Sequence, residues 1–189
     1  QGPFFLYVAY TVPHGRYEIP SDKPYSDKPW SEDAKNYAAM VTRLDSDVGK
    51  ILDFLAELGI DEHTIVFFCS DNGAFAAQMN CASNHPFRTE RAMIYEGSIR
   101  VCCMVRWPGR IPEGTVCDEM LVSMDFFPMI LRAAGAALPT DRIIDGRDPT
   151  ATLAGEASSA HTTLFWQYNR SNAIRQGPYK LIKPRTSKS

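Results

Sequence analysis

The sequence predicts an α/β fold, with a largely parallel sheet covered by helices and a small antiparallel unit at the C-terminal end. Two apolar runs, at 4–10 and 64–68, are rich in aromatic and β-branched residues, which is typical of strands buried on both faces. A long segment with helical periodicity separates them. The order strand, helix, strand is that of a crossover between two parallel strands.

The long helix has clear signals at both ends. Ser31 is a favourable N-cap residue, acidic residues follow it in the first turn, and Gly59 ends the pattern. One apolar stripe runs between these residues and predicts the face that packs on the sheet. Its members are Tyr37, Val41, Leu44, Val48, Ile51 and Leu55.

The chain changes character near residue 136, and we expect two parts. Residues 1–135 form the α/β part, with a further strand at 100–107 and a helix that begins at Asp125. Residues 136–189 form a small α+β unit that ends in a polar tail. The strands expected in this second unit are 163–168, 173–175 and 179–182, with a hairpin turn before the last one.

Composition is that of an ordinary globular protein. The 189 residues are 44% hydrophobic and 22% charged, and the net charge of −2 provides no basic surface for nucleic acid. No apolar run is long enough to span a bilayer. The five cysteines contain no Cys-x-x-Cys pair, so buried free thiols are expected rather than a zinc site or disulfides. They are Cys69, Cys81, Cys102, Cys103 and Cys117.

Polar residues follow both predicted strands of the α/β part. Asp71 and Asn72 come directly after the second strand, and His14 lies in the loop after the first. Ligands of open α/β sheets gather beyond the carboxyl ends of strands, so these side chains are expected to converge if Gly73 lets the backbone turn. Carboxylate and amide oxygens suit calcium or magnesium. The competing interpretations are a simple Asp-Asn-Gly turn and a solvated loop histidine.

Three arginines, Arg88, Arg91 and Arg100, form a cationic cluster downstream of the carboxylate. Such a cluster is ordinarily a solvated surface.

Several short motifs, taken in their order along the chain, resemble those of a known protein family. Tyr-x-x-Pro-His, Ser-Asp-Asn-Gly, Arg-x-x-Arg, Tyr-Glu-Gly-Ser-Ile-Arg-Val, Arg-Trp-Pro-Gly, Met-Asp-Phe-Phe-Pro and Ala-Ile-Arg-Gln-Gly-Pro-Tyr-Lys-Leu together resemble the C-terminal portion of a type I sulfatase. The resemblance covers nearly the whole chain. It implies an alkaline-phosphatase-like sandwich, a divalent metal that is usually calcium, and hydrolysis of aryl or glycan sulfate esters.

The resemblance also implies roles for four residues. Asp71 and Asn72 match metal ligands, and His14 matches a histidine that contacts the sulfate and assists the leaving group. Arg91 stands where the family usually has a sulfate-binding lysine. Ser98 replaces a second glycine, and Cys102 a common proline.

The family's nucleophile has no counterpart in this sequence. Type I sulfatases oxidise the cysteine of a Cys-x-Pro/Ala-x-Arg motif to formylglycine, and none of the five cysteines has that context. We therefore expect the chain to be a fragment of a longer enzyme, an incomplete domain that is inactive alone. The formylglycine is then expected upstream, as is any export signal of a periplasmic or secreted parent.

Two alternatives remain open. One is a phosphodiester or phosphonate hydrolase of the same superfamily, although Asn72 argues against it because relatives with that chemistry more often have histidine there. The other is a non-catalytic remnant that binds sulfated glycans or a partner chain. An unpaired sheet edge would also offer a surface for association.

Overall fold

The computed structural model describes residues 2–74, 82–88 and 94–183, and it divides the chain into two compact units. Unit 1 comprises residues 1–4, 65–67 and 105–189, and unit 2 comprises residues 5–64 and 68–104. Two small sheets are present in the described residues. Strands β1 (Val66–Cys69) and β2 (Cys103–Arg106) form a two-stranded sheet, and the other sheet has three strands.

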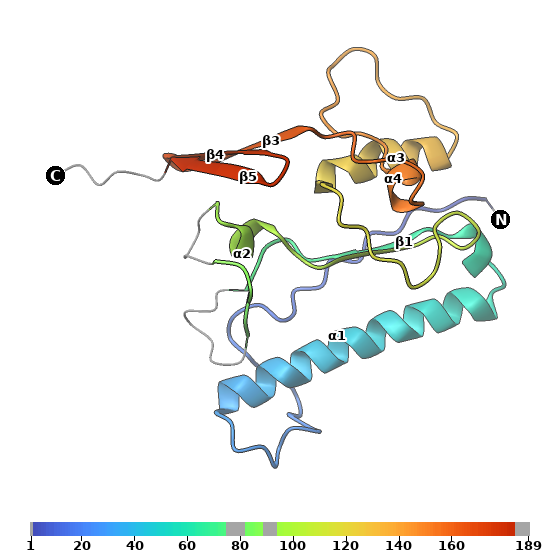
Figure 1. Cartoon of the computed structure of the whole chain (residues 1–189). Helices are drawn as coiled ribbons and strands as arrows, with labels where there is room; N and C mark the ends of the chain where they lie inside the picture. Colours follow the sequence, from blue (N-terminus) through green and yellow to red (C-terminus); the bar gives the residue numbers. More distant parts are fainter. Residues whose placement is uncertain (1, 75–81, 89–93, 184–189) are drawn as a thin grey trace. The chain divides into compact units, whose positions relative to one another are not determined.

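Unit 2 is built around α1 (Glu32–Glu57), the longest helix in Figure 1. The helix begins as predicted, because the Ser31 side chain accepts a hydrogen bond of 3.3 Å from the Ala34 backbone. The short helices η1 (Asp61–His63) and α2 (Glu96–Ile99) belong to the same unit. The predicted apolar stripe of this helix is only partly covered, because Leu55 is buried whereas Val41 is 40% exposed.

The described part of unit 1 contains three helices and the three-stranded sheet. Helices η3 (Ser123–Asp125) and α3 (Phe126–Ala133) follow each other directly, and α4 (Thr150–Leu153) comes next. The core of this unit includes Met129, which is fully buried, and the ring centroid of half-buried Phe126 lies 4.7 Å from that of Phe67.

The C-terminal strands confirm the predicted antiparallel sheet. Strands β3 (Thr163–Tyr168), β4 (Ser171–Gln176) and β5 (Tyr179–Lys183) pair in sequence order. Both pairings are antiparallel, and Gly177 turns the second hairpin with a φ of 54°. The boundary at residue 136 stays a prediction.

The predicted strand at 4–10 is wrong. This segment is not a strand, and its large side chains are exposed, with Phe5 at 72% and Tyr7 at 80%. An apolar, β-prone sequence becomes a strand only where a neighbouring strand offers hydrogen bonds. The described residues provide no such strand for this segment.

Candidate functional site

The loop after β1 brings Asp71 and Asn72 together. The chain bends at these two residues, and Asp71 Oδ1 accepts hydrogen bonds from the Asn72 backbone nitrogen at 2.9 Å and from Asn72 Nδ2 at 2.6 Å. Ser70 Oγ donates to the Asn72 carbonyl at 2.9 Å and holds the bend. Both side chains are exposed. The bend therefore places the two side chains side by side, with the amide nitrogen of Asn72 donating to the carboxylate of Asp71.

Gly73 is needed here for space rather than for an unusual backbone angle. A Cβ atom at this position would lie 1.9 Å from the Gly97 carbonyl oxygen. The Gly73 nitrogen donates to the Ser98 carbonyl at 3.0 Å, so the loop after β1 is fastened directly to α2. Gly73 has no positive φ, so the turn is made by the residues before it.

Asn84 holds the same loop from a second side. Its Oδ1 accepts from the Ala74 nitrogen at 2.9 Å, and its Nδ2 donates to the Ala74 carbonyl. A side-chain amide that pairs with both backbone groups of one residue acts like a short piece of sheet. A contact between residues ten positions apart leaves no local pattern in the sequence.

His14 lies in a separate turn of unit 2. Its backbone nitrogen donates to the Thr11 carbonyl at 3.0 Å, and the residue is exposed. Asp71 and Asn72 belong to the same unit. The convergence of His14 on them stays a prediction, and Arg91 lies outside the described residues.

The chemistry of the Asp71 and Asn72 donors fits a hard cation in part. A carboxylate and an amide oxygen are ligands that calcium prefers, but calcium takes about six to eight oxygens. Within residues 2–74, 82–88 and 94–183, no group of three or more His, Cys, Asp or Glu side chains could hold a metal ion. Two oxygen donors are therefore too few for a calcium site on their own.

The expectation of buried thiols is wrong for the four described cysteines. Cys69, Cys102, Cys103 and Cys117 are free and exposed, and Cys81 lies outside the described residues. Strand β1 carries Cys69 and strand β2 carries Cys103, and both strands are covered less than predicted. Neighbouring groups still desolvate the Cys103 thiol, and this raises its pKa to about 11, with smaller contributions from Cys69 and Cys102.

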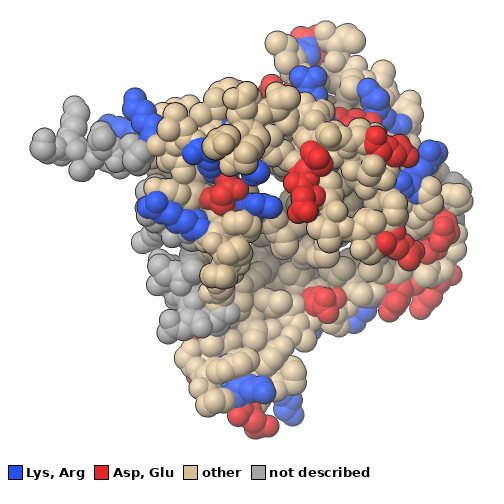
Figure 2. Space-filling model, viewed as in Figure 1, with Lys and Arg blue, Asp and Glu red and all other residues tan. Residues whose placement is uncertain are grey.

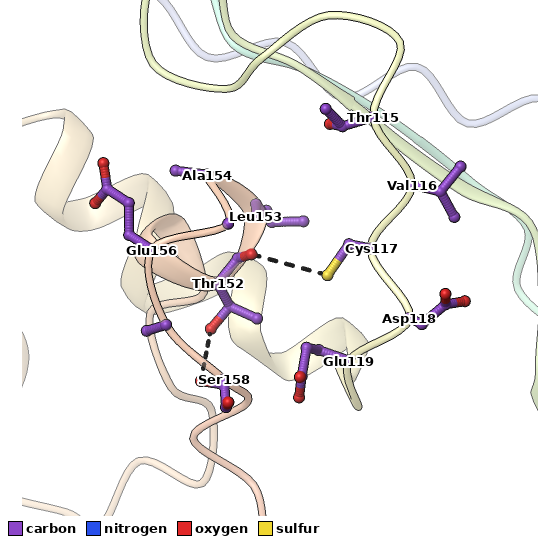
Figure 3. Close-up of a pocket in the computed structure, with 12 residues that line it drawn as sticks. Thr115, Val116, Cys117, Asp118, Glu119, Thr152, Leu153, Ala154, Glu156 and Ser158 are labelled. Carbon is purple, nitrogen blue, oxygen red and sulfur yellow. Dashed lines mark hydrogen bonds between the residues drawn. The ribbon is translucent and has the colours of Figure 1, made fainter.

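A separate pocket lies in unit 1. Its volume is about 510 Å³, and residues 115–119 and 152–158 line it (Figure 3). Cys117 Sγ faces the Thr152 carbonyl at 3.9 Å, and Thr152 Oγ1 donates to the Ser158 carbonyl at 3.1 Å. Neither segment contains a residue that the sequence singled out for chemistry.

The surface agrees with the near-neutral composition. Figure 2 shows acidic and basic side chains interspersed on the visible face. In the described part of the chain, no helix combines the length and the hydropathy that crossing a membrane demands.

Comparison with known proteins places these features in a family. The family model described as Sulfatase matches residues 1–136. N-acetylgalactosamine-6-sulfatase of Canis lupus familiaris is 36% identical over 184 residues, which cover 95% of this chain and 34% of that protein. Steryl-sulfatase of Mus musculus is 41% identical over 140 residues, or 70% of this chain and 22% of that protein.

Solved structures share the fold. The crystal structure of Ps i-CgsB superposes with a TM-score of 0.87 at 28% identity, covering 96% of this chain and 41% of that one. A structure of BT4656 in complex with D-glucosamine-2-N,6-O-disulfate gives a TM-score of 0.64 at 25% identity, covering 79% of this chain and 32% of that one. The chain thus has a sulfatase-like fold and spans about a third of the length of the first relative.

Proposed function

Because this chain belongs to the sulfatase family, we propose that it supplies part of the metal and sulfate site of an enzyme that hydrolyses sulfate esters. The observation that carries this proposal is the joined pair of Asp71 and Asn72 at the end of β1, inside the segment that the family model matches. A simple surface turn would not need Gly73 and Asn84 to fasten it on two sides.

In the proposed site, Asp71 and Asn72 would hold calcium through their side-chain oxygens. The cation would supply positive charge next to the sulfate, where negative charge develops as the ester bond breaks. Arg91 would bind the non-bridging sulfate oxygens through its planar fork of N–H donors. His14 would contact the sulfate and give a proton to the departing alcohol.

The nucleophile would come from outside this sequence. The chain has no Cys-x-Pro/Ala-x-Arg motif, so we propose that the formylglycine belongs to a part of the enzyme that the present 189 residues do not include. The chain by itself is then expected to bind without turnover.

The names of two relatives support the proposed substrate class. N-acetylgalactosamine-6-sulfatase and the BT4656 complex both indicate sulfated sugars by name. A sulfated sugar or aryl sulfate is therefore proposed as the partner of this site, ahead of a phosphate ester.

The test compares an aryl sulfate with the matching aryl phosphate as substrates of the full-length protein in the presence of calcium. We expect turnover of the sulfate, its loss in Asp71→Ala and its retention in Asp53→Ala. Asp53 is a matched control because it is an exposed aspartate on α1. Preferred turnover of the phosphate would favour the phosphoryl-transfer alternative, and wild-type activity in Asp71→Ala would refute the proposed metal site.

A further inference from the structure

Two arginines of the cationic cluster lie over aromatic rings in a reciprocal arrangement. The guanidinium carbon of Arg88 lies 4.1 Å from the centroid of the Tyr95 ring. That of Arg100 lies 4.6 Å from the centroid of the Phe87 ring. Each segment, 87–88 and 95–100, thus provides one cation and one ring to the other.

Backbone contacts fasten this arrangement to the loop of the proposed metal site. The Gly97 nitrogen donates to the Arg88 carbonyl at 2.9 Å, and the Phe87 nitrogen donates to the Asn84 carbonyl at 2.9 Å. The same segments hold the loop after β1, because Ser98, next to Gly97, accepts from the Gly73 nitrogen and Asn84 pairs with Ala74. The two cation–π pairs and the Asp71–Asn72 bend therefore belong to one interlocked set of loops within unit 2.

This arrangement suits a second anion. Both arginines are exposed, and a guanidinium over a ring keeps its N–H donors in its own plane, where they reach an oxyanion. The ring contact also orders the side chain beforehand, which lowers the entropy lost when a ligand binds. A solvated surface cluster would not need two rings to orient its cations.

We propose that Arg88 and Arg100 bind a second sulfate group on the sugar whose first sulfate occupies the proposed site, so that the substrate is a sugar with two or more sulfates. This inference rests on the proposed function. It assigns Arg88 and Arg100 to substrate recognition rather than to the reacting atoms.

The test measures binding of two probes to the full-length protein, with its formylglycine cysteine replaced by alanine so that no probe is hydrolysed, by isothermal titration calorimetry in calcium buffer. The probes are D-glucosamine-2-N,6-O-disulfate and D-glucosamine 6-sulfate. We expect the disulfate to bind about tenfold more tightly, as one or two additional charge-assisted hydrogen bonds would give. Arg88→Gln and Arg100→Gln should each reduce the ratio of disulfate affinity to monosulfate affinity severalfold. The affinity for the monosulfate should stay unchanged. Arg110→Gln, an exposed arginine of unit 1, should keep the ratio.

The outcomes separate the two proposals. The role of Arg88 and Arg100 is overturned if the wild type binds both probes equally, or if both glutamine variants keep the affinity ratio. Binding of the monosulfate would still support the proposed function in either case. Binding of neither probe overturns both. If circular dichroism finds a glutamine variant unfolded, Arg88→Met and Arg100→Met decide, because methionine keeps an unbranched stem over the ring and removes the charge. An unchanged affinity ratio in both methionine variants then refutes the proposal.

Discussion

His161 Nε2 lies 2.7 Å from Asp125 Oδ1, and the Asp125 carboxylate is almost completely buried in unit 1. The same Oδ1 accepts from the Arg147 backbone nitrogen at 2.8 Å, and Oδ2 accepts from the Val122 nitrogen at 2.9 Å. One carboxylate therefore joins the start of α3 to two segments that follow it by 22 and 36 residues.

Replacement of Asp125 should destabilise unit 1 strongly. Asp125→Ala leaves a buried imidazole and two backbone N–H groups without their acceptor, and loss of one partner of a buried pair costs about 3–5 kcal/mol. Asp125→Asn keeps one oxygen acceptor and should cost less. Urea unfolding monitored by fluorescence measures both changes in the free energy of unfolding.

The control for this prediction is Asp141→Asn. Asp141 also pairs with a cation, Arg142, but its side chain is 65% exposed. Its replacement should leave the unfolding midpoint unchanged, because exposed ion pairs contribute little to stability. Equal effects of Asp125→Ala and Asp141→Asn would contradict a structural role for the buried carboxylate.

Gly73→Ala should disrupt the loop of the proposed metal site. The added Cβ would meet the Gly97 carbonyl oxygen at 1.9 Å, so one of the two backbones must move. We expect a lower melting temperature and loss of sulfate-ester turnover in the full-length protein.

Gly49→Ala is the matched control for that change. Gly49 lies in α1, and nothing lies within 4 Å of a Cβ added there. Alanine should stabilise the helix by about 0.5–1 kcal/mol. A melting temperature that rises in both variants would show that the approach of Gly73 to Gly97 is not required.

The sequence could predict elements whose signals are local. Ser31 and Gly59 bracket α1 within two residues of its observed ends, and Gln176-Gly177-Pro178 marks the turn between β4 and β5. The joined Asp71 and Asn72 could be anticipated because both follow one apolar strand.

Features that depend on distant partners could not be predicted. The segment at 4–10 has the composition of a strand, but strand formation needs a neighbour that composition does not reveal. Asp125 was identified as the residue that begins α3, yet its side chain contacts His161 instead of capping that helix. The packing of Gly73 on Gly97 likewise joins residues 24 positions apart.

Arg91 provides the sharpest test of the proposed sulfate contact. Arg91→Ala in the full-length protein should abolish most turnover, because it removes the positive charge proposed to face the sulfate. Arg91→Lys should retain much of the activity, since it keeps that charge and restores the residue usual in the family. Steady-state kinetics with an aryl sulfate measures both, and wild-type turnover in Arg91→Ala would show that the assignment is wrong.

Cys103 should be a slow thiol whose ionisation weakens the fold at high pH. With its pKa raised to about 11, its thiolate fraction at pH 8 is roughly two orders of magnitude below that of an ordinary cysteine, so its alkylation by iodoacetamide should be slower in proportion. The folded state holds the proton more tightly than the unfolded state. Stability should therefore fall as the pH rises from about 9 to about 11.

Mass spectrometry of alkylated peptides and urea unfolding at several pH values measure the two effects of the Cys103 pKa. Cys103→Ser should remove the part of the stability loss at high pH that comes from ionisation of Cys103, because serine does not ionise in this range. Rapid labelling of Cys103 at pH 8 in the folded chain would mean that the thiol is not desolvated. The slope of stability against pH would then have to come from other groups, and the serine variant would leave that slope unchanged.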